Sequence, residues 1–356
     1  MKGKDLNRIC LFNSSVIWGG GEKWHLETAK KLAARGFEPV IFCDPRGDLY
    51  HKSNQSGIRT IPVKIRNLSF LNPFRIISLY VHFRRIGAGT LIAGLTSDLK
   101  AAALAARLYG IDSIFYRRGT ALPLKNNLLN RILYKRLTDA IIVNSKEIRN
   151  ILISQNPSFI DERKIHLIYN EVDLTHGKEH LPVNTRAYRS NGEVILGNIG
   201  RLVEQKGQKY LIELARYLKE RDIGFRILIA GSGKLKNQLT QYAEKMGVED
   251  EVVFMDFIED INTFLREIDI FVFPFLHEGS SHTLLEVMAA SKPVVAFNIS
   301  SIPEIVEHNR NGFLVETGNS GQLFQSVLRL IEKKELQTSF GQYGREKVEK
   351  QFNSDQ

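Results

Sequence analysis

The decapeptide HEGSSHTLLE, residues 277–286, carries two glutamates, Glu278 and Glu286, on either side of a glycine-serine turn. It follows the apolar run IDIFVFPF, which is typical of a buried β-strand. A helix is predicted to begin just after the serines, so Glu278 projects from a strand-tip loop and Glu286 rises from the second helical turn. The amides between them are unpaired donors at a helix N-terminus, which favours an anion. The stretch therefore predicts acceptors for sugar and ribose hydroxyls around a phosphate cradle.

Two cations precede a second predicted helix. In GNIGRLVEQKGQKYLIELA, residues 197–215, Arg201 comes just beyond a strand and Lys206 stands at the predicted helix start. Open α/β sheets bind ligands at the carboxyl ends of their strands. An Arg fork and a Lys point charge five residues apart suit a diphosphate. Taken alone, two such residues are more often exposed surface cations, and it is the neighbouring decapeptide that favours the diphosphate.

Strand-like and helix-like runs alternate along the whole chain, which predicts parallel sheets with crossover helices. The series runs from RICLF (8–12) to KIHLIYN (164–170) and restarts at EVILGNIG (193–200). The polar stretch LPVNTRAYRSNGE, residues 181–193, is the predicted linker. The expected fold is α/β, with two Rossmann-like doubly wound domains over residues 1–186 and 187–356.

Bulk composition excludes several classes of protein. A chain of 356 residues with 43% apolar and 25% charged residues is typical of a two-domain globular protein. No apolar run is long enough for a bilayer span, and ICLF is too short for a signal-peptide core, so a cytoplasmic location is expected. Cys10 and Cys43 both lie in strand-like runs and are predicted to be small buried hydrophobes.

The positive charge is concentrated in the first half of the chain. Residues 1–185 hold 28 Lys and Arg against 15 Asp and Glu, or +13, whereas residues 186–356 hold 21 against 24, or −3. The first half is therefore expected to meet an anionic partner. The segment NPFRIISLYVHFRRI, residues 72–86, mixes Phe74, Ile77, Val81 and Ile86 with arginines. It could be a basic amphipathic helix on a membrane or a helix packed on its own sheet.

Three other stretches resemble known motifs but do not fit them. HGKEH (176–180) has the spacing of a reversed zinc-protease motif, but its glycine disfavours a helix and it lacks a third ligand. GSGK (231–234) fails the Walker spacing. The contiguous glycines in WGGGEKWHLETAKKL (18–32) do not fit the dinucleotide pattern, although their amides could still meet another phosphate.

Several motifs, in this order along the chain, resemble those of the retaining glycosyltransferase family 4, which has the GT-B fold. The resemblance covers nearly the whole chain and rests on the following stretches: GGGEKWHLETAKKL, AIIVNSKEIR, YNEVDL, IGRLVEQKG, ILIAGSG, VVFMDFIED, FPFLHEGSSHTLLEVMAASKPVVA and IPEIVEHNRNGFLVE. It implies two domains that face each other across a cleft, with the acceptor on the first and a nucleotide sugar on the second. In the family the last helix packs back on the first domain.

The resemblance also implies roles for particular residues. Arg201 and Lys206 would bind the donor diphosphate, Glu278 the donor sugar and Glu286 the ribose. The remaining donor-site residues would act mainly through their backbone: Gly20 and Gly21 in a loop that closes over the reacting centre, Phe257 and Ile258 beside the base, and Gly279, Ser280, Ser281, His282 and Thr283 around phosphate and sugar hydroxyls.

The chain departs from the family pattern at a few positions. Many members have a histidine near the donor sugar at the position of Arg118 in SIFYRRG. Arg118 is therefore counted among the catalytic residues, and the sugar that the chain prefers is left open. Asp256 and Glu171 replace common glycines.

No D-x-D motif occurs in the sequence, which argues against the metal-dependent GT-A class. Arg201, Lys206 and the helix terminus could stabilise a departing diphosphate, so neither a metal nor another cofactor is expected. No nucleophile is evident, and the resemblance implies that the leaving phosphate helps to deprotonate the acceptor.

The expected activity is transfer of a sugar from a nucleotide diphosphate, UDP in the first place, to a glycan or lipid-linked acceptor in cell-surface polysaccharide or lipopolysaccharide synthesis. A nucleotide-sugar epimerase or hydrolase of the same fold and a catalytically silent binding subunit are the alternatives. An anionic membrane surface is a further candidate partner, with peripheral binding at the inner face of the cell membrane. Nucleic acid is not expected, because the cations lack interleaved aromatic residues.

Overall fold

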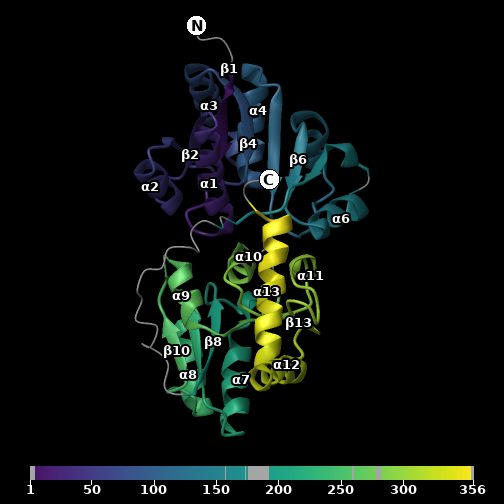
Figure 1. Ribbon diagram of the computed structural model, residues 1–356. Coiled ribbons are helices and arrows are strands. Elements are labelled where there is room, and N and C mark those ends of the chain that lie inside the picture. The colour runs from purple at the N-terminus through teal and green to yellow at the C-terminus, as the bar shows by residue number, and fades with distance from the viewer. Residues whose placement is uncertain are drawn as a thin grey trace. The chain divides into compact units, whose positions relative to one another are not determined.

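A computed structural model describes residues 5–156, 158–172, 174, 192–258, 260–277 and 282–353. The chain divides into two compact units, Met1–Tyr169 and Asn170–Gln356. The linker predicted at residues 181–193, the motif at 176–180 and four residues of the opening turn, Glu278 to Ser281, lie wholly or largely outside the described residues. Each unit is described by itself (Figure 1).

The first unit is built on a seven-stranded sheet in the order β3-β2-β1-β4-β5-β6-β7, and every pairing is parallel. Its strands are β1 (Asp5–Phe12), β2 (Glu38–Cys43), β3 (Arg59–Pro62), β4 (Ala88–Ala93), β5 (Ser113–Arg118), β6 (Ala140–Val143) and β7 (Ile165–Leu167). Its helices are α1 (Gly20–Ala34), α2 (Asp48–Gln55), η1 (Ser69–Leu71), α3 (Pro73–Ile86), α4 (Thr96–Tyr109), α5 (Leu128–Ile132), the π-helical turn η2 (Leu133–Leu137), α6 (Lys146–Gln155) and η3 (Glu162–Lys164).

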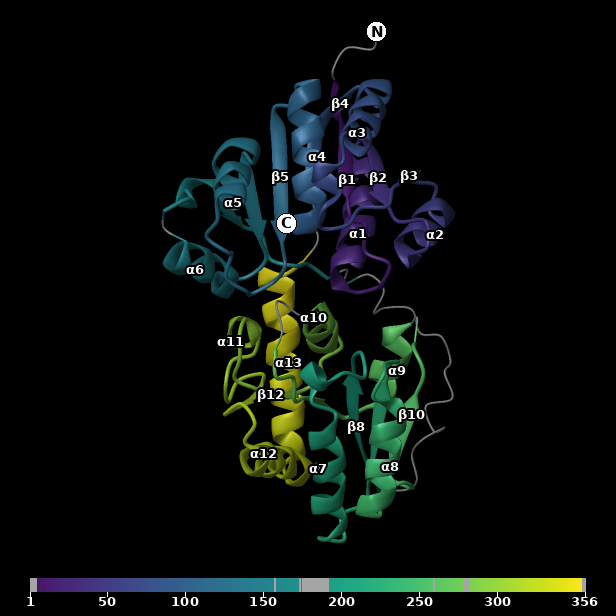
Figure 2. The same cartoon turned by 180° about the vertical axis from the view of Figure 1, so that it is seen from behind.

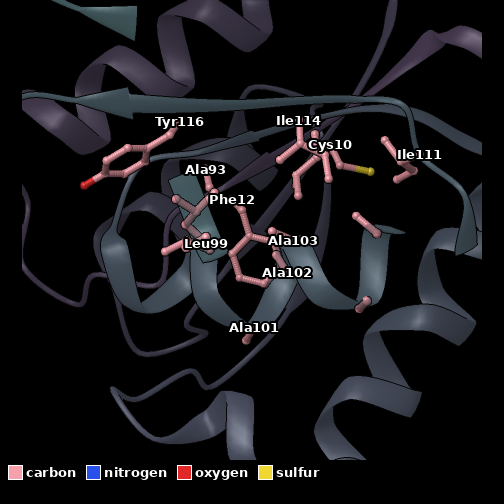
Figure 3. Close-up of a cluster of buried hydrophobic side chains, with 14 of the residues drawn as sticks. Cys10, Phe12, Ala93, Leu99, Ala101, Ala102, Ala103, Ile111, Ile114 and Tyr116 are labelled. Atoms are coloured by element: carbon pink, nitrogen blue, oxygen red, sulfur yellow. The ribbon is translucent and has the colours of Figure 1, made fainter. Parts of the chain in front are cut away.

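Helices cover both faces of this sheet (Figures 1 and 2). The larger apolar core lies between the sheet and α3, α4, η2 and α6, and the smaller one lies between the sheet and α1 and α2. Figure 3 shows part of the larger core, where Cys10 and Phe12 face the alanines of α4. Small alanine side chains let this helix approach the sheet closely. Cys10 and Cys43 belong to opposite cores, and both are buried free thiols, as predicted.

Helix α3 shows how local sequence sets the boundaries of an element. Asn72 caps it by accepting from the Arg75 amide at 3.3 Å, and Pro73 occupies its first turn. Gly87 ends it in the left-handed region at φ 74°. The predicted helix is confirmed. It packs on the sheet through Ile76, Leu79, Phe83 and Ile86, whereas Phe74 and Ile77 are exposed.

The second unit has a six-stranded, all-parallel sheet in the order β10-β9-β8-β11-β12-β13. Its strands are β8 (Val194–Ile199), β9 (Phe225–Ala230), β10 (Val252–Met255), β11 (Ile270–Phe273), β12 (Val294–Phe297) and β13 (Gly312–Val315). Its helices are η5 (Glu204–Lys206), α7 (Lys209–Lys219), α8 (Lys236–Met246), α9 (Ile261–Glu267), α10 (His282–Ala289), α11 (Ile302–Ile305), α12 (Ser320–Glu332) and α13 (Lys334–Gln351). Helices α7, α8 and α12 enclose its main core.

The doubly wound α/β fold of both units is thus confirmed. In each sheet the strand order reverses once, between β1 and β4 and between β8 and β11. Ligands of such sheets bind outside the carboxyl ends of the strands at this reversal. Helix α13 ends beside the start of the unit, where the amide of Val172 donates to the carbonyl of Phe352 at 3.0 Å.

Candidate functional site

The loops that follow β8 and β11 are locked together at the reversal point of the second sheet. The amide of Leu276 donates to the carbonyl of Gln205 at 2.8 Å. Gly207 has a φ of +61°, and a Cβ there would lie 2.0 Å from the carbonyl oxygen of Pro274. Only glycine fits such a close approach of two backbones in the left-handed region. The loop after β8 is therefore held against the loop after β11.

Arg201 and Lys206 are both carried by the loop after β8. Arg201 is exposed one residue beyond Gly200, and its carbonyl accepts from Gln208 Nε2 at 3.0 Å. Lys206 is the last residue of η5 rather than the first of a helix, and its Nζ lies 3.8 Å from the ring centroid of Phe275. This cation–π contact holds the ammonium group beside the strand end of β11. The two predicted diphosphate cations therefore lie at the sheet reversal.

Helix α10 follows β11, the strand next to β8 in the sheet, and supplies further predicted residues. His282 and Thr283 form its first turn, and Glu286 lies half-buried in its second turn. The opposite side of the helix is buried, which fixes the orientation of the polar side. Glu278, Gly279, Ser280 and Ser281 are outside the described residues.

Phe257 and Ile258 follow β10, an edge strand of the sheet. Its carboxyl end lies at the same edge of the sheet as those of β8 and β11, because all strands are parallel. Phe257 is exposed. Asp256, which replaces a glycine common in the family, accepts from Lys236 Nζ at 2.6 Å at this strand end. The structure thus brings the described residues that were predicted for a donor site in the second unit to one edge of one sheet.

The remaining predicted residues lie in the first unit. Gly20 and Gly21 open α1, after the extended Gly19. Arg118 ends β5, is only 5% exposed, and donates from its guanidinium to the carbonyl of Leu122. In this conformer its side chain is turned into the unit, where it shapes the loop after β5.

A buried polar cluster near Gly20 and Gly21 was not predicted from the sequence. Asn13, directly after β1, donates from Nδ2 to Glu22 Oε1 at 3.1 Å. Glu22 is 8% exposed and occupies the third position of α1, where its charge complements the helix dipole. Its carboxylate lies close enough to Arg117 to raise the pKa of that guanidinium, although burial lowers it overall to about 10. Arg117 therefore stays charged at neutral pH.

Arg117 is the centre of this cluster. Its guanidinium carbon lies 5.0 Å from the ring centroid of Trp24. A Cβ on Gly119 would lie 2.8 Å from its Nη1, and a Cβ on Gly21 would lie 3.8 Å from the same atom. Arg117 is 7% exposed, so the side chain is packed between the start of α1 and the loop after β5. The cluster thus sets the position of the glycines that open α1.

His25 also holds the start of α1 in place. Its Nδ1 lies 2.8 Å from the carbonyl oxygen of Gly21, and because a carbonyl only accepts, Nδ1 carries the proton. Burial lowers the pKa of His25 to about 3, so the ring is neutral. The ring packs on Gly94 at the end of β4, where a Cβ would lie 2.3 Å from Cε1. Among the described residues, no hydrogen-bond partner faces its Nε2.

Asp98 anchors the loop between β1 and α1. Its two carboxylate oxygens accept from the amide and the hydroxyl of Ser14, the amide at 2.8 Å. Asp98 is fully buried in the first turn of α4, and burial raises its pKa to about 7 in spite of these hydrogen bonds. The loop is therefore tied to α4 as well as to α1.

These residues could have been suspected individually but not as a group. Glu22 stands at the capping-box position of the glycine-led helix, and its helix neighbour His25 is polar in an otherwise apolar stripe. Asn13, Asp98 and Arg117 come from three other segments, and only the strand order brings them together. Among the described residues, no group of three His, Cys, Asp or Glu side chains could hold a metal ion.

Two family models match the chain in succession. Residues 18–176 match "Glycosyltransferase Family 4", and residues 185–347 match "Glycosyl transferases group 1". An uncharacterized glycosyltransferase of Methanocaldococcus jannaschii is 30% identical over 344 residues, which cover 92% of this chain and 89% of the relative. The chain is a family 4 glycosyltransferase.

Two further similarities bear on this glycosyltransferase. A UDP-Gal:alpha-D-GlcNAc-diphosphoundecaprenol alpha-1,3-galactosyltransferase of Escherichia coli is 25% identical over 339 residues, covering 90% of this chain and 87% of the relative. The crystal structure of Anabaena HepE in complex with UDP superposes with a TM-score of 0.84 at 21% identity, covering 97% and 96% of the two chains. The latter confirms the GT-B type of fold. Within the described ranges, every helix of the glycosyltransferase is too short or too polar to cross a bilayer.

Proposed function

We propose that this glycosyltransferase moves a sugar, with retention of configuration, from a UDP-sugar to a lipid-linked or glycan acceptor during cell-surface polysaccharide synthesis. The observation that carries the proposal is the gathering of Arg201, Lys206 and the polar side of α10 at the reversal point of the second sheet. Two cations beside a helix N-terminus suit a diphosphate. The UDP in the similar Anabaena structure supports uridine as the nucleoside.

In the proposed complex the donor lies along the carboxyl edge of this sheet. Arg201 and Lys206 hold its diphosphate, Glu286 accepts from the ribose, and the backbone near Phe257 and Ile258 meets the base. Glu278 accepts from the sugar, the amides from Gly279 to Thr283 hold phosphate and sugar hydroxyls, and the loop at Gly20 and Gly21 covers the reacting centre. For Arg118 to approach the sugar, its contact with the Leu122 carbonyl must first be exchanged.

The transfer breaks the bond between C1 of the sugar and the β-phosphate oxygen, and the electron pair goes to UDP. The acceptor hydroxyl oxygen forms its bond to C1 on the same face, and its proton passes to the leaving phosphate. The charge that develops on UDP is stabilised by Arg201 and Lys206, which are preorganised by the locked loop. No enzyme nucleophile takes part in this scheme.

The proposed acceptor is carried on a lipid diphosphate or belongs to an anionic glycan. The first unit holds 27 Lys and Arg against 12 Asp and Glu, or +15, and the second holds 22 against 27, or −5. A basic first unit favours an anionic acceptor there. The diphosphoundecaprenol acceptor in the name of the E. coli relative supports the lipid-linked form. Such an acceptor would place the reaction at the cytoplasmic face of the membrane.

Incubation with a panel of nucleotide sugars, with and without diphosphoundecaprenyl acceptors, tests this function. We expect UDP release from one UDP-sugar, strongly stimulated by an acceptor, and an α-linked product from an α-linked donor. Acceptor-independent release or isomerisation of the sugar would indicate the epimerase or hydrolase alternative. Binding of UDP-sugars without any turnover across the panel would indicate a catalytically silent subunit.

We further expect the transfer to proceed in the presence of EDTA. The physical reason is that the two cations and the helix terminus already neutralise the leaving diphosphate. The measurement is the initial rate of UDP release with EDTA and after addition of Mg²⁺ or Mn²⁺. Complete loss in EDTA that either ion restores would contradict the metal-free scheme.

A further inference from the structure

One face of the first unit combines exposed apolar side chains with cations. This face, called the α3–α5 face below, comprises η1, α3, α4 and α5, which cover one side of the sheet. Helix α4 contacts α3, η1 and the π-helical turn that continues α5, so these elements form one layer (Figure 2). The layer buries one side in the larger core and leaves the other side accessible.

The first apolar group on this face lies at η1 and the start of α3. Leu68 is 69% exposed, Leu71 66%, Phe74 81% and Ile77 57%. The exposure of these side chains does not mean that α3 lacks a core-facing side, because Ile76 and three further residues of the helix are buried on its opposite side. The Asn72 cap and the Pro73 turn hold the helix start in place, so Phe74 is presented outward by a fixed backbone.

A second apolar group lies at the other end of the layer, in the loop after β5 and in α5. Leu122, Leu128 and Ile132 are exposed there, Leu128 to 74%. Leu104 and Leu108 of α4 are exposed between the two groups. Scattered apolar side chains are normal on a protein surface, but a set gathered on one layer marks an interaction site.

The charges around these groups are predominantly positive. Residues 64–86 and 113–138 contain eleven Lys and Arg and not a single Asp or Glu. Eight of the eleven are exposed, namely Lys64, Arg66, Arg84, Arg85, Lys125, Arg131, Lys135 and Arg136. Of the two acids between these ranges, Asp98 is fully buried and bound to Ser14, and Asp112 is exposed beyond the end of α4. The face therefore presents cations to solvent with almost no compensating carboxylate.

The second unit lacks this combination. Among its described residues, the large apolar side chains that are exposed are Phe257 and Leu276, and both lie at the candidate donor site. Its net charge is −5, against +15 for the first unit. The apolar and basic character is thus a property of the first unit alone.

We propose that the α3–α5 face docks on an anionic lipid bilayer. Aromatic and aliphatic side chains partition into the interfacial region of a bilayer, and lysines and arginines beside them bind the anionic headgroups. A soluble polyanion would need the cations but would leave Leu68, Leu71 and Phe74 in water. The inference deepens the proposed function, since it brings the first unit to the surface that holds a lipid-linked acceptor. Vesicle binding does not depend on activity, so the two can fail separately.

Flotation with vesicles tests the docking. Full-length protein is mixed at low salt with phosphatidylcholine vesicles or with vesicles that also contain phosphatidylglycerol. We expect binding to the anionic vesicles only, and we expect it to weaken as salt rises. Arg84→Glu with Arg85→Glu should weaken it by tenfold or more, and Phe74→Ser with Leu71→Ser by about tenfold.

Matched variants separate docking from general effects. Lys333→Glu with Lys334→Glu makes the same charge change at exposed sites of the second unit, and Leu6→Ser removes an equally exposed leucine elsewhere on the first unit. Both should float as the parent protein does. Absence from anionic vesicles at low salt, or equal loss in test and control variants, would overturn the proposal. If the Phe74→Ser, Leu71→Ser variant still binds and the arginine variant does not, the face binds polyanions through charge alone, which would also overturn docking on a bilayer.

Discussion

Replacing Arg117 with alanine is expected to destabilise the first unit by about 3 kcal/mol, the largest stability change that we predict for a single residue. The change leaves the buried Glu22 carboxylate without the charge that faces it, and breaking a buried charge pair on one side is costly. It also removes the stacking on Trp24. Urea unfolding followed by fluorescence measures the effect, because both tryptophans of the chain, Trp18 and Trp24, lie in this unit.

Two variants control for this result. Arg221 of the second unit stacks on Tyr217 at 3.6 Å but is exposed, so Arg221→Ala should destabilise that unit by less than about 1 kcal/mol. Urea unfolding followed by circular dichroism measures this control, because both tryptophans lie in the first unit. The double variant Arg117→Met with Glu22→Gln removes both charges and should recover much of the loss. Equal destabilisation by Arg117→Ala and Arg221→Ala would mean that the buried cluster contributes no more than a surface stack.

Replacing Arg201 with alanine is expected to lower kcat/KM for the donor about ten- to a hundredfold. A charge-assisted hydrogen bond is worth roughly 1.5–3 kcal/mol, and this one would be strongest to the departing diphosphate. Stability should change little, because the exposed side chain leaves the buried Leu202 and the Gln208 contact to the backbone intact. Initial rates of UDP release across donor concentrations provide the measurement.

The matched control for Arg201 is Arg216→Ala. Arg216 is exposed on α7 of the same unit and pairs with Glu220 at 2.7 Å, far along the helix from the loop after β8. It should retain the parent rate. An Arg201→Ala enzyme with parent kcat/KM would contradict the diphosphate role, whether or not the donor proves to be a UDP-sugar.

The architecture could be predicted from the sequence because the alternation of strand-like and helix-like runs is visible without any knowledge of contacts. The predicted series of strands from RICLF to KIHLIYN and its restart at EVILGNIG are present, and the helix predicted at 72–86 lies within one residue of its predicted bounds. The short edge strand β3 and the helix α2 were not predicted, since RTIP is brief and DLYHKSNQ is polar. Helices α12 and α13 were also missed.

Side-chain environments were predicted less well than elements. The periodicity of 72–86 could not show which apolar stripe faces the sheet, because Phe74 and Ile77 repeat with the same helical spacing as Ile76 and Leu79. The cluster around Arg117 depends on β1 and β5 lying on either side of β4, which no local pattern encodes. The position of Arg201 could be predicted, because it follows a strand directly and the carboxyl ends of parallel strands lie at one edge of the sheet.

The hydrogen bond between Val172 and Phe352 brings the two ends of the second unit side by side. A unit whose ends meet can be closed by a short peptide and opened in an exposed turn, as in a circular permutant. The turn after α8 offers such an opening, since Gly247 is already left-handed and the neighbouring Glu249 and Asp250 are exposed. The second unit is thus built so that its connectivity can be rewired while all five strand pairings of its sheet are kept, which makes it suitable for transplantation as a self-contained module.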